Sequence, residues 1–306
     1  MRGGWTRRGV ISALPGAMLA GQALAQPSQE LKGPTVFETG SPDYHTASFT
    51  LPGPEGGSDD FIEVAWPKRG TPKPDILYAL DGRAVAEFLT PERLAVLAAQ
   101  GGPAIVAVGY SLKARFATME RARDYTPPGP DGAHVPDPRG RPGGGAAEFR
   151  ERLVREILPR AESYLPQGAG RRALWGHSYG GLFSLWEGMR AEPDFDRVIA
   201  ASPALWWNDG AFWHDILAQL ETPPVPRIRI DLHRGGAERE RASRPDNAAA
   251  QGVVAMRDRL PADASAQLDA ALRGAGVAGE TRVFPGLSHG EAFSASLAHT
   301  LGLDAA

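Results

Sequence analysis

Short apolar segments alternate with longer amphipathic segments along most of this 306-residue chain. Residues 104–110, "AIVAVGY", form a continuous apolar run, which is typical of a strand buried on both faces of a parallel sheet. Residues 146–165 instead carry apolar residues at helical spacing. The alternation predicts a single-domain α/β fold in which helices flank a mostly parallel central sheet. We expect strands at 61–67, 75–80, 104–110, 172–176, 197–203, 227–233 and 280–285, and helices at 91–100, 146–165, 179–190, 247–273 (with a break at Pro261) and 291–301.

One segment interrupts this alternation. Residues 126–145, "TPPGPDGAHVPDPRGRPGGG", are nearly all proline, glycine or polar, which predicts a long loop. Loops of this length in compact domains are usually either functional or disordered. We therefore treat the segment as a candidate part of a binding site.

The first 25 residues have a composition of their own. They contain three arginines and no acid, followed by an apolar stretch that ends in Ala23-Leu24-Ala25. This order predicts a signal peptide cleaved before Gln26, with residues 26–306 as the mature domain, and hence export to the periplasm. A membrane anchor is the alternative, but the stretch contains Pro15 and is shorter than the ~20 residues that a spanning helix needs. Thr6-Arg7-Arg8 resembles the twin-arginine export signal.

The composition argues against two kinds of function. With 33 basic and 36 acidic residues the formal net charge is -3, whereas nucleic-acid-binding proteins usually have a basic face. The chain has no cysteine, so neither a disulfide nor a thiolate metal site can form. No metal or organic cofactor is implied.

Residues 176–180 read Gly-His-Ser-Tyr-Gly, with Ser178 at the centre. This is the spacing of a nucleophile elbow, in which a strand turns sharply into a helix and holds the serine Oγ above the sheet. A predicted strand precedes the motif and a predicted helix follows it, as an elbow requires. We expect Ser178 to be a nucleophile, although glycine and serine are also common in ordinary loops.

A serine hydroxyl needs a base, and His289 is the best candidate. It follows the last predicted strand, where loops leave the carboxyl edge of a parallel sheet and where ligands bind in open α/β folds. His177 is adjacent to Ser178, but its side chain should point away from the serine, so we interpret it as packing. The remaining histidines are expected to be surface or structural residues: His45, His134, His214, His233 and His299.

The acid that would orient His289 is expected on the loop after the penultimate strand. That loop offers Glu238, Glu240 and Asp246, and Glu238 is preferred because it comes soonest after the glycine turn. A solvated charged turn is the alternative interpretation for each of them. Asp231 lies within the strand itself and is a lesser candidate.

Acyl transfer also needs two N–H donors for the developing oxyanion. The backbone N–H of Tyr179, at the start of the helix after the serine, is the first candidate. The second is expected from the loop after the strand at 75–80, which gives the N–H of Arg83. Asp81 and Gly82 could instead form only a tight turn.

The chain resembles the esterase D-like branch of the α/β-hydrolases, and within it the siderophore esterases that open enterobactin, salmochelin or bacillibactin trilactones. The resemblance covers most of residues 45–300 and implies that Ser178 is the nucleophile, that His289 is the base and that the residue after Asp81-Gly82 is an oxyanion donor. It is less specific for substrate, because related proteins include formylglutathione hydrolases, carbohydrate esterases and mycolyltransferases. The matching segments are "YALDGRAV" (78–85), "VGY" (108–110), "RARDYTPP" (121–128), "GGGAAEF" (143–149), "GHSYGG" (176–181), "SPALWW" (202–207) and "PGLSHG" (285–290).

Two features are candidates for substrate contact. Arg121 and Arg123 could face an anionic group such as a catecholate; the alternative is a salt bridge with Glu120 or Asp124. Three tryptophans at 206, 207 and 213 could stack on catechol rings or sugars, with packing as the alternative. We assign ligand contact to Trp207.

Together these patterns predict a serine esterase that cleaves a small-molecule ester through an acyl-serine intermediate. The resemblance implies that this ester is the trilactone of a catecholate siderophore, which can arrive as the ferric complex. Acyl transfer to a sugar or lipid alcohol would use the same residues. A non-catalytic binding protein on the same fold is disfavoured, because a binding module does not need a strained elbow.

Overall fold

The computed structural model describes Met1, residues 29–241 and residues 248–304. Apart from Met1, the predicted signal peptide lies outside the described residues, as does the candidate acid Asp246. Among the described residues, no helix is both long enough and apolar enough to cross a membrane.

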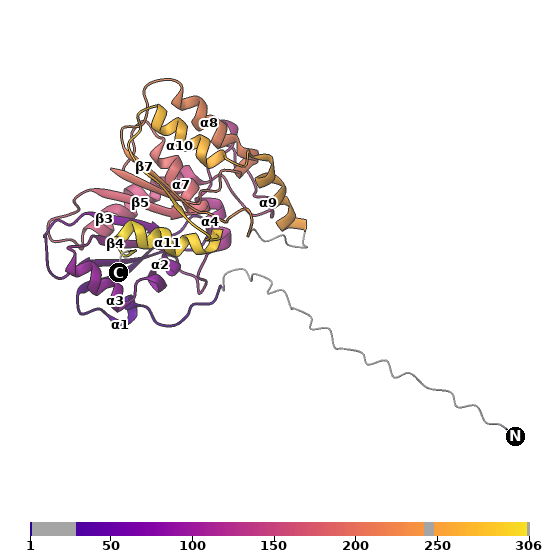
Figure 1. Cartoon of the computed structure of the whole chain (residues 1–306). Helices are drawn as coiled ribbons and strands as arrows, with labels where there is room; N and C mark the ends of the chain where they lie inside the picture. Colours follow the sequence, from indigo (N-terminus) through magenta and orange to yellow (C-terminus); the bar gives the residue numbers. More distant parts are fainter. Residues whose placement is uncertain (2–28, 242–247, 305–306) are drawn as a thin grey trace.

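Eight strands form one sheet, as the alternating pattern predicts (Figure 1). Their order is β1-β2-β4-β3-β5-β6-β7-β8; β1 and β2 are antiparallel to their neighbours, and all strands from β4 to β8 run parallel. The prediction of a mostly parallel sheet is therefore confirmed. The strands are β1 Tyr44–Leu51, β2 Asp60–Pro67, β3 Ile76–Leu80, β4 Ala104–Tyr110, β5 Arg172–His177, β6 Arg197–Ala201, β7 Arg229–Gly235 and β8 Thr281–Phe284.

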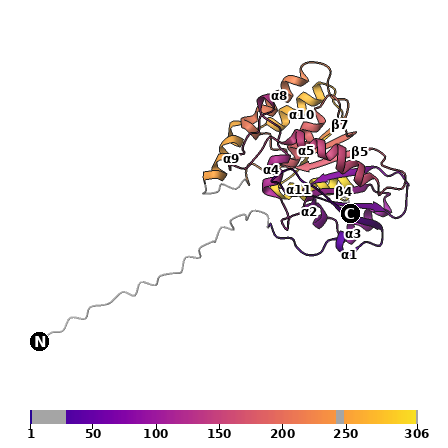
Figure 2. The same ribbon diagram turned by 180° about the vertical axis from the view of Figure 1, so that it is seen from behind.

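Helices cover both faces of the sheet (Figures 1 and 2). Residues of α7, α8 and α10 join the hydrophobic core on one face, and residues of α2, α3 and α11 join the core on the other. The helices are α1 Val36–Thr39, α2 Gly82–Phe88, α3 Pro91–Ala99, α4 Thr118–Asp124, α5 Ala146–Arg152, α6 Leu158–Glu162, α7 Tyr179–Gly188, α8 Ala211–Leu220, α9 Ala248–Arg259, α10 Ala264–Gly274 and α11 His289–Leu301, with single turns at Pro130–Gly132 and Trp207–Gly210.

The predicted helix at 146–165 has an irregular middle. A π-helical segment, Leu153–Ile157, separates α5 from α6. Pro159 has no N–H to donate to the carbonyl of Arg155, which lies inside that segment, so the regular ladder cannot continue there. The helix ends at Glu162, three residues before its predicted end.

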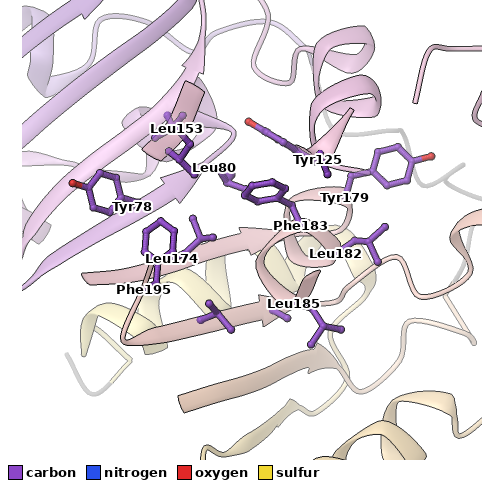
Figure 3. Packing of buried hydrophobic residues seen from close by; sticks show 14 of the residues in the cluster. Tyr78, Leu80, Tyr125, Leu153, Leu174, Tyr179, Leu182, Phe183, Leu185 and Phe195 are labelled. Carbon is purple, nitrogen blue, oxygen red and sulfur yellow. The ribbon is translucent and has the colours of Figure 1, made fainter. Parts of the chain in front are cut away.

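The helix that follows Ser178 is buried almost entirely. Figure 3 shows Leu182, Phe183 and Leu185 of α7 among the side chains of this core, with Tyr125 and Leu80 close to Phe183. The ring centroids of Phe183 and Tyr125 are 6.2 Å apart. Because α7 is packed on every side, its first turn is held rigidly at the carboxyl edge of the sheet.

Candidate active site

Ser178 has the backbone of a nucleophile elbow. Ser178 lies between β5 and α7, and its φ of 60° and ψ of -113° fall in a region that residues with side chains rarely adopt. Close contacts require glycine at two positions of this turn: a Cβ on Gly176 would lie 2.2 Å from the carbonyl oxygen of Gly180, and one on Gly181 would lie 2.5 Å from that of Ala201. A Cβ on Gly180 would instead meet Leu80 at 3.4 Å, which is an ordinary contact. Strand, turn and helix can meet this closely only without side chains at these positions.

Both predicted oxyanion donors lie at the starts of helices on neighbouring strands. Tyr179 is the first residue of α7, Arg83 is the second residue of α2, and β3 and β5, which lead into these helices, pair in parallel. N–H groups in the first turn of a helix have no acceptor within it. Asp81 is the N-cap of α2 and Gly82 is its first residue, so the turn that they form is the beginning of a helix. Gly82 is needed there, because a Cβ would lie 2.8 Å from the backbone of Gly109.

His289 and Glu238 lie together: Glu238 is in the turn after β7, as the sequence predicts, and His289 is the first residue of α11, directly after the loop that follows β8. His289 Nδ1 is 3.3 Å from Glu238 Oε2, and the histidine side chain is 46% exposed, so its other nitrogen can reach a ligand. The second carboxylate oxygen accepts bonds of 2.6 Å from Ser202 Oγ and from the N–H of Gly235. Although burial opposes ionisation, these donors and His289 lower the pKa of Glu238 to about 2.

Of the other acid candidates, Asp231 is fully buried and paired with Arg197 and Arg229. It therefore stabilises the sheet. Glu240 is exposed.

His177 contacts His289 through both its ring and a hydrogen bond. Its Nε2 is 2.8 Å from the backbone carbonyl oxygen of His289, and the two ring centroids are 4.6 Å apart. Since a carbonyl can only accept, Nε2 carries the proton and donates it. Burial lowers the pKa of His177 well below its ordinary value, so the ring is neutral. The packing role predicted for His177 thus extends to positioning the residue beside Glu238.

Arg121 joins the turn at Asp81 to the end of β5. Its Nε and Nη2 donate to the two carboxylate oxygens of Asp81 at 2.8 and 3.0 Å, and Nη2 also donates to the carbonyl of His177 at 3.1 Å. The alternative prediction, a salt bridge of Arg121 with Glu120 or Asp124, is therefore wrong. With two of its three nitrogens engaged, Arg121 can offer only Nη1 to a substrate anion, so we interpret it as a positioning residue. Its neighbour Arg123 does pair with Asp124, at 2.6 Å.

The assignment of Trp207 to substrate contact needs correction. Trp207 is 2% exposed, and its indole N–H donates to the carbonyl of Pro127 at 3.1 Å. A Cβ on Gly143 would meet its ring at 2.5 Å. Trp207 therefore anchors both ends of the predicted 126–145 loop. Trp206 is only partly buried and is the better candidate for ligand contact.

The 126–145 loop is also fixed at its centre. Asp137 is 4% exposed and accepts bonds from the N–H groups of Arg139 and Arg141 and from the guanidinium of Arg141. Its carboxylate accepts a further bond of 3.3 Å from the hydroxyl of Tyr179, next to Ser178. This contact was not predictable from the sequence, because Asp137 lies in a segment without regular spacing. The loop is thus folded against the candidate site.

A serine raised on a strand-to-helix turn, in a sheet whose later loops hold a histidine against a carboxylate, is the arrangement of the α/β-hydrolases. The chain belongs to the esterase family described as "Putative esterase", whose model matches residues 62–303.

Comparison with individual proteins gives the same class. The chain is 32% identical to the apo-salmochelin esterase of Escherichia coli O6:H1 over 92% of this chain and 85% of that protein. It is 35% identical to the siderophore triacetylfusarinine C esterase of Aspergillus fumigatus over 55% of this chain and 59% of that protein. Among solved structures, the enterobactin and salmochelin hydrolase IroE matches with a TM-score of 0.67 and 29% identity, over 87% of this chain and 97% of IroE. IroE has also been solved in complex with DFP, a reagent for serine hydrolases.

Proposed function

We propose that Ser178, His289 and Glu238 carry out the hydrolysis of a carboxylic ester. Ser178 Oγ attacks the ester carbonyl while His289 takes its proton and passes it to the departing alcohol. Water, activated by the same histidine, then releases the acid and restores the serine. The N–H groups of Arg83 and Tyr179 stabilise the oxyanion of each tetrahedral intermediate.

Two observations carry this proposal: His289 is oriented by a carboxylate, and its backbone is bonded to the residue that precedes the elbow serine. The Glu238 carboxylate accepts the Nδ1 proton of His289, which leaves Nε2 unprotonated and able to act as a base. His177, the residue before Ser178, holds the backbone of His289 at 2.8 Å. The His177 side chain thereby joins the strand that leads to the nucleophile, β5, to the base, His289.

We further propose that the substrate is the trilactone of a catecholate siderophore and that the protein acts in the periplasm. The names of the relatives support the substrate class, since they include esterases of salmochelin, enterobactin and bacillibactin. The arginine and alanine pattern of the first 25 residues supports export. Cutting the trilactone would leave linear pieces that chelate iron more weakly.

The experiment that tests this function is product analysis. The purified enzyme is incubated with apo- and ferric enterobactin and, separately, with nitrophenyl esters, and the products are identified by chromatography and mass spectrometry. Stepwise appearance of linear trimer, dimer and monomer is the expected result. Hydrolysis of the nitrophenyl esters alone would contradict the siderophore as substrate but would still support the esterase activity. Ester products formed with an added alcohol would identify an acyltransferase.

Replacing Glu238 with glutamine is expected to lower kcat by on the order of 10²-fold or more, because the neutral amide no longer favours the productive tautomer of His289. Its effect on stability should depend on pH. The pKa of Glu238 is lowered from 4.5 to about 2 in the folded chain, so its stabilisation is complete above pH 4.5 and is lost as the pH falls through 2. Urea unfolding at pH 7 and pH 3 measures this difference between wild type and E238Q.

The matched control is Glu240→Gln, the same substitution two residues further on at an exposed position. It is expected to leave kcat and the pH dependence of stability unchanged. Equal behaviour of E238Q and E240Q would remove Glu238 from the mechanism.

A further inference from the structure

Two histidines and a glutamate meet beneath the far end of α11, away from His289. His233 lies in β7, Glu280 directly precedes β8, and His299 lies in the last turn of α11. One possible ligand atom from each residue lies within 4.8 Å of those of the other two. His299 follows His289 by ten residues, roughly 15 Å along the helix axis, so this cluster is separate from the candidate active site.

The decisive atom is a buried nitrogen without a partner. His233 is 1% exposed, and its Nδ1 lies 2.8 Å from Ser296 Oγ, while its Nε2 has no hydrogen-bond partner among the described residues. Buried polar atoms are nearly always paired, so an unpaired nitrogen calls for an explanation. If Nδ1 donates to Ser296, Nε2 presents a bare lone pair towards the cluster.

The other two residues have the spacing of metal ligands. His299 Nε2 is 3.5 Å from Glu280 Oε1. Two donor atoms at about 2 Å from a shared tetrahedral ion would lie roughly 3.3 Å apart. The Nδ1 atoms of both histidines also have hydrogen-bond partners, as in metal sites, where a ligating histidine donates the N–H of its other nitrogen to an acceptor. His299 Nδ1 faces the Asp304 carboxylate, and His233 Nδ1 faces Ser296.

An explanation without metal accounts for only part of this arrangement. A protonated His299 between Asp304 and Glu280 would satisfy both of its nitrogens, but it would leave His233 Nε2 unpaired. Arg197 Nη2 and Arg229 Nη2 approach Glu280 Oε1 at 3.8 and 3.6 Å. They do not block a cation, because neither guanidinium is within hydrogen-bond distance of Glu280 and both form their short ion pairs with Asp231.

We propose that His233, Glu280 and His299 bind one Zn²⁺ ion through two imidazole nitrogens and one carboxylate oxygen. Two histidines and a glutamate are an established ligand set for zinc, in which the fourth position is held by water. The Glu280 side chain is 44% exposed and the His299 side chain 20%, so the open position faces solvent. The ion would draw the three ligand atoms closer together and tie β7, β8 and the end of α11 into one unit.

The test uses the purified, tag-free full chain, stripped with EDTA and dialysed into metal-free buffer. Zn²⁺ is added in competition with a chromophoric chelator, the stoichiometry is measured by plasma mass spectrometry, and Co²⁺ is substituted to report the coordination geometry by its visible absorption. We expect one ion per chain, a tetrahedral cobalt spectrum and a Tm that rises with Zn²⁺. Glu280→Gln and His299→Gln change partly exposed residues, so they should fold and lose stoichiometric binding. Asp304→Asn should weaken it by roughly 10–100-fold.

His214→Gln is the control, since His214 is an exposed histidine in α8; it should bind zinc as wild type does. Substoichiometric uptake by the wild type, or equal uptake by wild type, E280Q and H299Q, would overturn the site. Zinc binding here does not depend on the ester chemistry. The stripped chain should still hydrolyse nitrophenyl esters, so a failed zinc titration and a failed esterase assay remain distinguishable.

Discussion

Ser178→Ala is expected to lower kcat for ester hydrolysis by on the order of 10⁴–10⁶-fold while leaving the protein folded. No other group in the mechanism can form the acyl intermediate, and loss of the nucleophile in serine hydrolases has effects of this size. The substitution removes one oxygen from a side chain that is only partly buried, so the packing of α7 is unchanged. Initial rates with a nitrophenyl ester and the Tm of both proteins measure the two expectations.

Ser184→Ala provides the matched control. Ser184 lies six residues further along the chain in α7, is fully buried, and donates to the carbonyl of Gly180 at 3.0 Å. Its loss should change Tm slightly and leave kcat within a factor of about two, because it touches no reacting atom. A Ser178→Ala variant that retains more than a tenth of wild-type activity would overturn the assignment of the nucleophile.

Arg121→Met is expected to destabilise the chain by about 3–5 kcal/mol, because it leaves the Asp81 carboxylate buried without its counter-ion. Asp81 is 4% exposed and precedes the helix that carries the Arg83 N–H, so kcat should fall for neutral and anionic esters alike. Urea unfolding gives the free energy of unfolding, and kinetics with a paired neutral and anionic ester give the second effect.

The control for Arg121 is Arg171→Met. Arg171 pairs with Asp75 at 2.9 Å, but the two side chains are 81% and 49% exposed. Solvent screens such a pair, so its loss should cost less than about 1 kcal/mol. If R121M were instead as stable as R171M and raised KM only for the anionic ester, Arg121 would be a substrate ligand and not a positioning residue.

Regular elements with strong periodicity were predictable from the sequence, and weakly patterned ones were not. The run at 104–110 coincides with β4, and the break expected at Pro261 falls between α9 and α10. Strand β1 was missed because it lies at the edge of the sheet and mixes exposed and partly buried residues. Helix α2 was missed because its seven residues are too few to show a helical period.

In the candidate site, too, some residues were predictable from the sequence and some contacts were not. Ser178 and Tyr179 are fixed by a local motif, and His289 and Glu238 by their order after particular strands. The contact between Arg121 and Asp81 joins residues 40 positions apart, and that between Ser202 and Glu238 joins residues 36 apart. Such pairs depend on how parallel strands bring their ends together, which a single sequence does not specify.

Three residues other than glycine have positive φ where adjacent parallel strands end: Asp81 at 61° after β3, Ser178 at 60° after β5 and Ser202 at 46° after β6. Each such conformation costs on the order of 1–3 kcal/mol. All three lie at the edge where the proposed oxyanion donors, nucleophile and acid are held. Heat resistance and turnover in this protein therefore compete for the same backbone, and relaxing that edge to gain one would be expected to sacrifice the other.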